Sequence, residues 1–328
     1  MPSEIDSRSY LFVVADAEAG ERLDRYLVAR QLPQTRSQLK RCIDGGCCLV
    51  NGQKARPAQR MKSGDSVVFS PPLPEPSMVL PEEIELSVLF EDDQLIVVDK
   101  PAGMVVHPAA GHRRGTLVGA LLGHCEELSG VGGVLRPGIV HRLDKLTSGV
   151  MVASKTDFAH VHLAQQFKEH TIERRYQAIV VGHMKKPSGV FDTWHGRHSK
   201  DRKKFTSRGA SGRRAVTHFR VLQEFKTSSL LELRLETGRT HQVRVHLADH
   251  GYPVLGDRQY GRLPSDDCLR QIARELGRQA LHAHTLGFSH PKTEQRLKFA
   301  APLPLDMQRA IDCLATKPGD KCGLKELP

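Results

Sequence analysis

The hydrophobic positions near the start of the chain predict a small unit that opens with two helices. Leu23, Tyr26 and Leu27 recur at the spacing of one helix face. A second helix should begin near Thr35 or Ser37, because either residue can cap it, and it should end at the glycine pair 45–46. We therefore expect two short helices before residue 47.

Two strands should follow these helices, joined through a tight turn. The segments 48–50 and 65–69 are apolar and short, and Asn51-Gly52 is a typical turn dipeptide. A Pro-rich stretch, 71–76, comes next and should form a stiff linker. The order of elements predicts a compact module that ends before this linker.

A second and larger folding unit is predicted after the linker. Its first elements are a strand near 88–90, a strand at 95–98 and a helix at 116–122. Later strands and helices alternate irregularly, which favours an α+β fold with a mixed, mostly antiparallel sheet and flanking helices. The predicted organisation is a flexible N-terminus (1–17), a small module (18–72), a linker (73–84), a large domain (85–312) and a C-terminal tail (313–328).

A polar loop inside the large domain lies between two apolar segments. Residues 138–153 read GIVHRLDKLTSGVMVA, and the segments 139–140 and 150–153 should form short buried strands. Arg142 and Asp144 are two positions apart, so they would project from one side of an extended chain. An isolated Arg-x-Asp of this kind is commonly only a structural ion pair.

Charge favours a polyanionic partner, with nucleic acid ahead of an anionic membrane. The 328 residues carry a formal net charge of +11 and a pI near 9.4. A basic protein with a solvated surface would show the same total. No segment reaches ~18 consecutive apolar residues and the first nine residues are polar, so we expect a cytoplasmic protein without a membrane partner.

Basic residues gather in two places. Residues 20–70 hold ten Lys and Arg against four Asp and Glu, and Arg36, Lys40 and Arg41 on the second predicted helix are candidates for phosphate contacts. Residues 194–220 hold nine Lys and Arg, among them Arg202, Lys203 and Lys204, and show little periodicity, so we expect a mobile insert that contacts RNA. Solvated surface is the alternative for both.

Metal chemistry is not indicated. The seven cysteines form no Cys-x-x-Cys pair, and the closest histidine pairs, 160/162 and 282/284, have no Glu or Cys at metalloenzyme spacing. We expect neither a metal nor another cofactor.

Three ordered motifs resemble those of one enzyme family. The loop HRLD at 141–144 followed by TSG at 147–149, the segment ERRYQAIVVG at 173–182, and LETGRTHQVRVH at 235–246 are similar to the active-site, tyrosine and basic motifs of pseudouridine synthases of the ribosomal large-subunit type, the RluA family. The first module likewise resembles the RNA-binding domain named after ribosomal protein S-four, in RSQLK at 36–40 and VNG at 50–52. The resemblance implies a catalytic pseudouridine synthase domain behind an RNA-binding module.

The resemblance also implies roles for four residues. Asp144 matches the essential aspartate, which acts as a nucleophile toward the sugar or base or removes a sugar proton; sequence leaves these routes open. Arg239 matches a basic residue that pairs with this aspartate and keeps it ionised. Tyr176 would stack on the target base, and Arg142 would fill the gap left by a flipped nucleotide. His141 should be structural.

The expected function follows from this resemblance. We expect the chain to isomerise specific uridines in large-subunit (23S) ribosomal RNA, either in the free RNA or in its assembly intermediates. We also expect the chain to be a monomer and not to bind DNA. Three alternatives stay open: a synthase that modifies another structured RNA such as tRNA, a non-catalytic RNA-binding factor in ribosome assembly, and a metal-dependent RNA hydrolase. The presence of Asp144, Tyr176 and Arg239 argues against the non-catalytic factor. The lack of a metal-ligand cluster in the sequence argues against the hydrolase.

Overall fold

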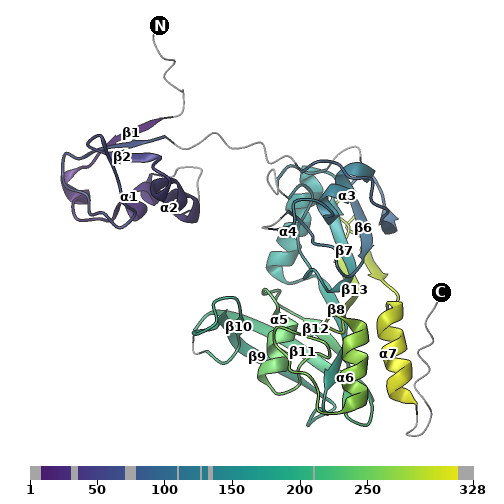
Figure 1. Cartoon of the computed structure of the whole chain (residues 1–328). Coiled ribbons are helices and arrows are strands. Elements are labelled where there is room, and N and C mark those ends of the chain that lie inside the picture. Colours follow the sequence, from purple (N-terminus) through teal and green to yellow (C-terminus); the bar gives the residue numbers. More distant parts are fainter. Residues whose placement is uncertain are drawn as a thin grey trace. The chain divides into compact units, whose positions relative to one another are not determined.

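The chain divides into two compact units, residues 1–77 and 78–328, in a computed structural model (Figure 1). The structure describes residues 9–30, 36–70, 79–108, 111–125, 128–131, 136–209 and 211–316. The predicted Pro-rich segment, 71–76, and a possible cap at Thr35 lie outside these residues. Each unit is described by itself below.

The N-terminal unit packs two helices against a four-stranded antiparallel sheet. Its elements are β1 (Tyr10–Val13), the 3-10 helix η1 (Asp16–Glu18), α1 (Leu23–Ala29), α2 (Arg36–Asp44), β2 (Cys48–Val50), β3 (Gln53–Lys54) and β4 (Ser66–Phe69), and the strand order is β1-β4-β2-β3. The two predicted helices and the predicted strands at 48–50 and 65–69 are confirmed, but the Asn51-Gly52 turn leads from β2 into β3, a strand that was not predicted. The helix begins at Arg36, so Ser37 is within α2 and does not cap it.

The prediction of a flexible segment over residues 1–17 is wrong for Tyr10–Val13, which form β1. This strand pairs antiparallel with β4, from Tyr10 opposite Phe69 to Val13 opposite Ser66. Leu11 and Val13 are exposed, whereas Phe12 contacts the core. A strand of four residues that is buried on one side only, with its partner more than fifty residues away, carries too weak a local pattern to be recognised.

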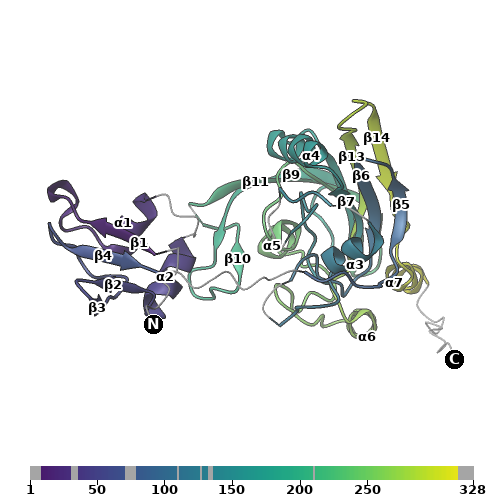
Figure 2. The ribbon, with the colours of Figure 1, turned by 90° about the horizontal axis from the view of Figure 1, so that it is seen from above.

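The larger unit is built on one ten-stranded sheet (Figure 2). Its strands are β5 (Ser87–Glu91), β6 (Leu95–Lys100), β7 (Ser148–Ser154), β8 (Glu173–Val181), β9 (Ser188–Arg197), β10 (Phe205–Thr206), β11 (Arg213–Glu224), β12 (Ser228–Leu235), β13 (Leu281–Ser289) and β14 (Arg296–Ala300). They are ordered β10-β9-β11-β12-β8-β13-β7-β6-β5, with β14 also paired to β13. Among the described strands of this sheet, β13 and β7 are the one pair that runs parallel, so the predicted mixed, mostly antiparallel sheet is confirmed.

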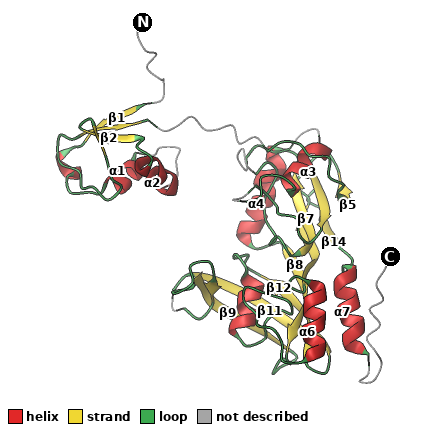
Figure 3. Cartoon of the chain, in the orientation of Figure 1, coloured by secondary structure: helices red, strands yellow, loops and turns green. Residues whose placement is uncertain are grey.

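The helices of the larger unit pack against its sheet (Figure 3). They are α3 (Leu117–His124), α4 (Asp157–Glu169), α5 (Gln242–Asp249), α6 (Asp267–Leu276) and α7 (Leu305–Ala315). On β6, Ile96 and Val98 pack in the cluster that contains α3, whereas Leu95 and Val97 pack in the cluster that contains Leu163 of α4. Successive residues of a strand point to opposite faces, so the continuous apolar run at 95–98 reflects burial on both sides.

A third hydrophobic cluster lies under the helices of the other half of the sheet. It joins apolar residues of β8, β11 and β12 to Val243 and Leu247 of α5, Leu269 of α6 and Met307 of α7. Helices α6 and α7 lie side by side (Figure 1). Helix α7 continues to Ala315, three residues into the predicted tail, because its buried face belongs to this core.

Two further local predictions are wrong. Ile139 forms only an isolated bridge to Ala153, so 139–140 is part of a loop rather than a strand. The basic segment 194–220 is not an irregular insert: most of it belongs to β9, β10 and β11. Its periodicity was hidden because apolar Val190 and Trp194 are exposed on β9 whereas polar His195 is buried, which obscures the alternation of a half-buried strand.

Within the described ranges, no helix combines the length and the apolar character needed to cross a membrane.

Candidate active site

A cavity of about 490 Å³ brings the three motifs together. It is lined by residues from the 138–149 loop, from α4 and β8, and from the segment that leads into α5. The lining residues that carry chemistry are Arg142, Asp144, Lys168, His170, Arg174, Tyr176, Arg239, His241 and Arg244. All four residues expected in the site, Arg142, Asp144, Tyr176 and Arg239, are among them.

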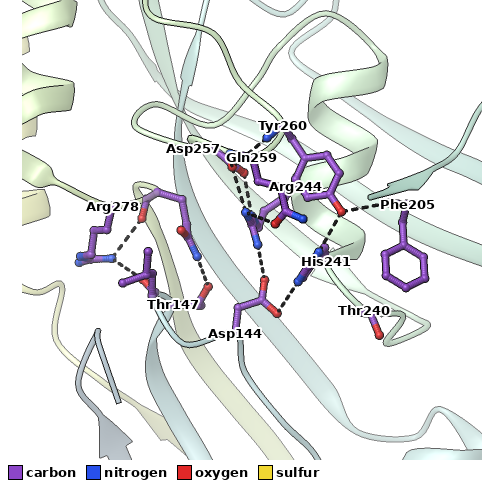
Figure 4. Close-up of polar contacts among 12 residues, drawn as sticks. Asp144, Thr147, Phe205, Thr240, His241, Arg244, Asp257, Gln259, Tyr260 and Arg278 are labelled. Atoms are coloured by element: carbon purple, nitrogen blue, oxygen red, sulfur yellow. Dashed lines mark hydrogen bonds and ion pairs between the residues drawn. The ribbon is translucent and has the colours of Figure 1, made fainter. Parts of the chain in front are cut away.

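Asp144 is held by two residues of the third motif (Figure 4). Arg244 Nη1 donates to Asp144 Oδ2 at 2.9 Å, and His241 Nε2 lies 3.7 Å from Asp144 Oδ1. The Asp144 side chain keeps one fifth of its surface exposed, toward the cavity. The carboxylate is therefore fixed in direction while it stays accessible.

The expected pairing of Asp144 with Arg239 is wrong, because Arg244 makes that contact. Arg239 Nε instead donates to the carbonyl of Arg214, at 3.2 Å. Arg239 precedes α5, whereas Arg244 lies in the first turns of this helix on a side that is buried. The rotation of α5 about its axis decides which arginine reaches Asp144, and the motif alone does not show it.

Arg244 is in turn fixed by residues that follow α5. Its Nε and Nη2 donate to Asp257 Oδ2 and Oδ1 at 2.7 and 2.9 Å, and Nη2 also lies 3.2 Å from Gln259 Oε1. The guanidinium lies over the Tyr260 ring, 5.1 Å from its centre. Burial opposes the charge of Arg244, but the bonds to Asp257 and Asp144 outweigh it and raise the pKa of Arg244.

His241 connects Asp144 to Tyr260. Its Nδ1 lies 2.8 Å from the Tyr260 hydroxyl, which accepts a hydrogen bond from the Phe205 amide. The Tyr260 hydroxyl can therefore donate its own proton in a hydrogen bond to Nδ1. In a neutral ring the proton of the imidazole is then on Nε2, which faces Asp144. Burial lowers the pKa of His241 despite the opposing charge of Asp144, so the neutral ring is favoured at pH 7.

The loop beneath Asp144 is held through its carbonyl groups. The Lys145 carbonyl accepts from the Gly103 amide at 2.8 Å and lies 3.4 Å from Lys100 Nζ. The next carbonyl, of Leu146, accepts from Arg278 Nη1 at 3.3 Å. Two buried cations, Lys100 and Arg278, thus fix the backbone that carries the Asp144 carboxylate. Figure 4 shows Arg278 on this side of Asp144.

Lys100 is buried without a carboxylate bonded to its ammonium group. Its Nζ also donates to the carbonyls of Pro101 and Met104, at 2.7 and 3.0 Å. Burial and the charge of Arg278 lower the pKa of Lys100 to about 7, although Asp144 and Asp99 act against this shift. Backbone carbonyls satisfy the three donors that an ammonium offers.

Tyr176 lines the cavity from β8. Burial raises the pKa of its phenol, the charge of Arg174 opposes the shift, and the charge of Asp144 adds to it. The hydroxyl therefore keeps its proton at neutral pH. An apolar neighbourhood and a ring at the cavity wall suit a stacking surface for a base.

Arg142 is exposed at the rim of the cavity, whereas its neighbour His141 is built into the loop. His141 Nε2 accepts from the Val152 amide at 3.1 Å, and the ring stacks on Phe167. Burial and the charge of Arg174 lower the pKa of His141 to about 3, so the ring is neutral. This agrees with the structural role expected for His141.

The basic loop 198–204 is attached to the active-site segment. Arg202 and Lys203 are exposed and Lys204 is half-buried, and the Lys203 carbonyl accepts from Gln259 Nε2 at 3.0 Å. In the N-terminal unit, Lys40 and Arg41 are exposed on α2, and the Arg36 side chain lies outside the described residues.

Sequence reasoning missed Arg244, Asp257, Tyr260 and Lys100. Arg244 was inside the third motif, and Asp257 and Tyr260 stand in a polar run, GDRQYG, directly after apolar Val254 and Leu255. Lys100 ends an apolar strand and precedes a Gly/Pro-rich loop. Polar residues at the ends of buried strands were the available signal. Among the described residues, no cluster of three or more His, Cys, Asp or Glu could hold a metal ion.

Comparison with known families gives two matches. The RNA pseudouridylate synthase family matches residues 94–249, and the S4 domain matches residues 21–67. The first match covers β6 to α5 and so includes Asp144, Tyr176 and Arg244.

Individual proteins agree with these matches. The chain is 50% identical over 296 residues to "Ribosomal large subunit pseudouridine synthase D" of Zymomonas mobilis, covering 88% of this chain and 92% of that protein. It is 43% identical over 300 residues to "Uncharacterized RNA pseudouridine synthase YlyB" of Bacillus subtilis, covering 92% and 96%. The solved structure of "Human RNA Pseudouridylate Synthase Domain Containing 4" is similar with a TM-score of 0.53 and 27% identity, covering 69% of this chain and 92% of that one.

Proposed function

This chain belongs to the RNA pseudouridylate synthase family, and from that premise we propose that it converts specific uridines of large-subunit (23S) ribosomal RNA to pseudouridine with Asp144 as the reactive group. The observation that carries the assignment of Asp144 is its ion pair with Arg244 at the wall of the 490 Å³ cavity, where no other carboxylate occurs among the described lining residues. A ribosomal substrate is supported by the relatives named ribosomal large subunit pseudouridine synthase D.

The reaction breaks the bond between uracil N1 and ribose C1′, turns the base, joins C5 to C1′ and removes the proton from C5. A carboxylate serves this sequence either as a nucleophile or as a base toward the sugar. Both routes need an ionised Asp144, which the Arg244 guanidinium favours. Asp257 accepts hydrogen bonds from Nε and Nη2 of the same guanidinium and therefore orients Asp144 indirectly.

Tyr176 and Arg142 act on the base and on its former place in the RNA. The Tyr176 ring offers a flat apolar surface on which the uracil can stack inside the cavity, and its phenol is protonated there. A uridine inside a helix has to leave the stack before it can reach Asp144. The exposed guanidinium of Arg142 at the rim can stack in the vacated position and contact phosphate.

The N-terminal unit supplies affinity. Lys40 and Arg41 are exposed on α2 of a domain that matches the S4 family, and phosphate contacts of this kind bind RNA without reading its bases. Arg202, Lys203 and Lys204 add positive charge beside the active-site segment. A ribosomal RNA substrate would also place the activity in the cytoplasm.

The test is a transcriptome-wide map of pseudouridine in cells that contain the chain, lack it, or carry Asp144→Asn in its place. We expect particular pseudouridines of large-subunit ribosomal RNA to disappear in the last two and to return with the wild-type chain. Sites that vanish only from tRNA would overturn the proposed substrate. Unchanged maps in all RNAs would overturn the proposed function.

A further inference from the structure

Arg174 is a buried cation in the wall of the cavity, and no acidic residue in the described part of the chain pairs with it. Arg174 is 8% exposed, and its Nη2 donates to the Glu236 carbonyl at 2.6 Å, the one hydrogen bond that its side chain makes to the described residues. Its Nε has no hydrogen-bond partner, and among the described residues no carboxylate pairs with the guanidinium. A buried, unneutralised charge is costly, so its retention at a cavity needs an explanation.

Two further basic residues, Arg239 and His170, lie next to Arg174. All three line the same cavity; burial and the charge of Arg239 lower the pKa of Arg174, and burial, with the charges of Arg174 and Arg239, lowers the pKa of His170. The nearby carboxylate of Glu236 is engaged elsewhere, since Oε1 bonds His218 Nε2 at 2.5 Å. These three residues, Arg174, Arg239 and His170, are called the basic junction below.

The basic junction lies where the active-site cavity meets a second hollow. This second hollow has a volume of about 400 Å³, and it shares His170 and Arg239 with the cavity. It is also lined by Arg214 and Arg234. If one nucleotide of an RNA strand occupies the cavity, the backbone next to that nucleotide would therefore lie at the basic junction.

We propose that the basic junction binds a phosphodiester group of the RNA strand next to the uridine that occupies the Asp144 cavity. The guanidinium groups of Arg174 and Arg239 offer planar pairs of donors, the arrangement that fits phosphate oxygens. The Asp144 carboxylate is held at a distance from this anion by its own pair with Arg244. Arg239 thus positions the substrate rather than the catalytic carboxylate.

Gly238 makes room for this arrangement. A Cβ atom at position 238 would lie 2.6 Å from Arg174 Nη1, closer than side chains approach. Gly238→Ala would therefore displace the Arg174 guanidinium without changing any charge. This variant therefore tests whether the position of the Arg174 guanidinium matters, while its charge is kept.

Of the proposed function, this inference requires only that the substrate is RNA. It can therefore be tested by measuring RNA binding, without measuring turnover and without ribosomal RNA. The probe is a short fluorescent oligocytidylate with a single central uridine, in which one linkage at a time is replaced by an uncharged methylphosphonate. For the wild-type chain, neutralising one linkage beside the uridine should weaken binding about tenfold, as expected when a hydrogen bond to a charged group is removed. Neutralising a remote linkage should cost much less.

Arg239→Gln should weaken binding of the unmodified probe and flatten the dependence of log affinity on log salt by ~0.7. In this variant a neutral linkage beside the uridine should cost no more affinity than a remote one, so the special cost of that linkage is lost. Gly238→Ala and Arg174→Lys should reduce that special cost. The matched control is Arg309→Gln, the same charge change at an exposed position of α7, which should behave as wild type. Thermal unfolding of each variant shows whether it is folded.

Equal costs for all neutral linkages in the wild-type chain would overturn the inference. So would an Arg239→Gln chain that is folded and responds to the linkages as Arg309→Gln does. Failure of the pseudouridine map in ribosomal RNA would leave this binding result unaffected, and the two proposals are therefore tested separately.

Discussion

Arg244 Nη1 and Asp144 Oδ2 lie 2.9 Å apart although one hundred positions separate the two residues in the chain. The same guanidinium bonds Asp257, whose side chain is 1% exposed. One arginine therefore bonds both the carboxylate that we propose as the reactive group and a buried carboxylate.

Arg244→Gln should abolish turnover and lower the free energy of unfolding by about 3–5 kcal/mol, because the buried charge of Asp257 is left without its partner. Urea denaturation and single-turnover rates measure the two effects. Arg239→Gln is the control, since its side chain has no such partner, and it should be destabilised by less than ~1 kcal/mol. Equal destabilisation of both variants would contradict the arrangement.

Asp144→Asn should eliminate pseudouridine formation and leave RNA affinity within a few-fold of wild type. The amide keeps the size of the side chain, and its oxygen can still accept from Arg244, but the reactive charge is gone. The measurements are single-turnover rates at saturating RNA and filter binding of the same RNA. Asp267→Asn, at an exposed position of α6, should leave both unchanged, and measurable turnover by Asp144→Asn would disprove the role of Asp144.

Lys100→Met should slow single-turnover catalysis by about tenfold to a hundredfold, because the Asp144 loop loses an anchor at the Lys145 carbonyl and small displacements of reacting groups are costly. Affinity for RNA should not change, since Lys100 is buried. Lys145→Met is the matched control: its side chain is exposed in the same loop and should affect the rate less. A larger effect at position 145 would contradict this prediction.

The stability of the wild-type chain should carry a signature of Lys100 as a function of pH. Its pKa is about 7 in the folded chain, against an ordinary value of 10.5, so between these values the unfolded chain binds a proton that the folded chain has released. The free energy of unfolding of wild type should therefore rise with pH relative to Lys100→Met, by at most ~1.4 kcal/mol per pH unit. Parallel profiles between about pH 7.5 and 10 would show that Lys100 keeps its proton.

Charge reversal at Lys40 and Arg41 should weaken binding to target and non-target RNA alike and flatten the salt dependence of affinity by ~0.7 to 0.9 for each phosphate group that is no longer bound. Both side chains are exposed on α2. Single-turnover rates at saturating RNA should stay near those of wild type, because the cavity lies wholly in the larger unit. Lys62→Glu is the control within the same unit, and an unchanged salt slope in the double variant would show that α2 does not contact RNA.

Activity should persist in EDTA without added cofactor, because the reaction can be carried by the Asp144 carboxylate and Arg244. The measurement is pseudouridine formation by chain that has been dialysed against the chelator. Activity that disappears in EDTA and is restored by zinc would favour metal-dependent chemistry instead.

Local patterns in the sequence were sufficient for most elements of the two units. The spacing of Leu23, Tyr26 and Leu27 predicted α1, and the apolar run at 95–98 predicted β6, because periodicity depends only on neighbouring residues. The three motifs likewise identified Asp144 and Tyr176, which do line one cavity. β1 was missed because half of its apolar surface is exposed and its pairing depends on β4.

The partners of Asp144 were decided only by the tertiary structure. Arg239 and Arg244 occur in one motif and differ in the sequence by five positions, and the packing of α5 against the sheet turns the second of them toward Asp144. Asp257, Tyr260 and Lys100 reach the site from segments that share no motif with it. Local periodicity in the sequence indicated most of the helices and strands, and the motifs were enough to indicate Asp144 and Tyr176, which line the cavity. Long-range packing determined their partners, because ion pairs and buried hydrogen bonds depend on distances in space that no local periodicity encodes.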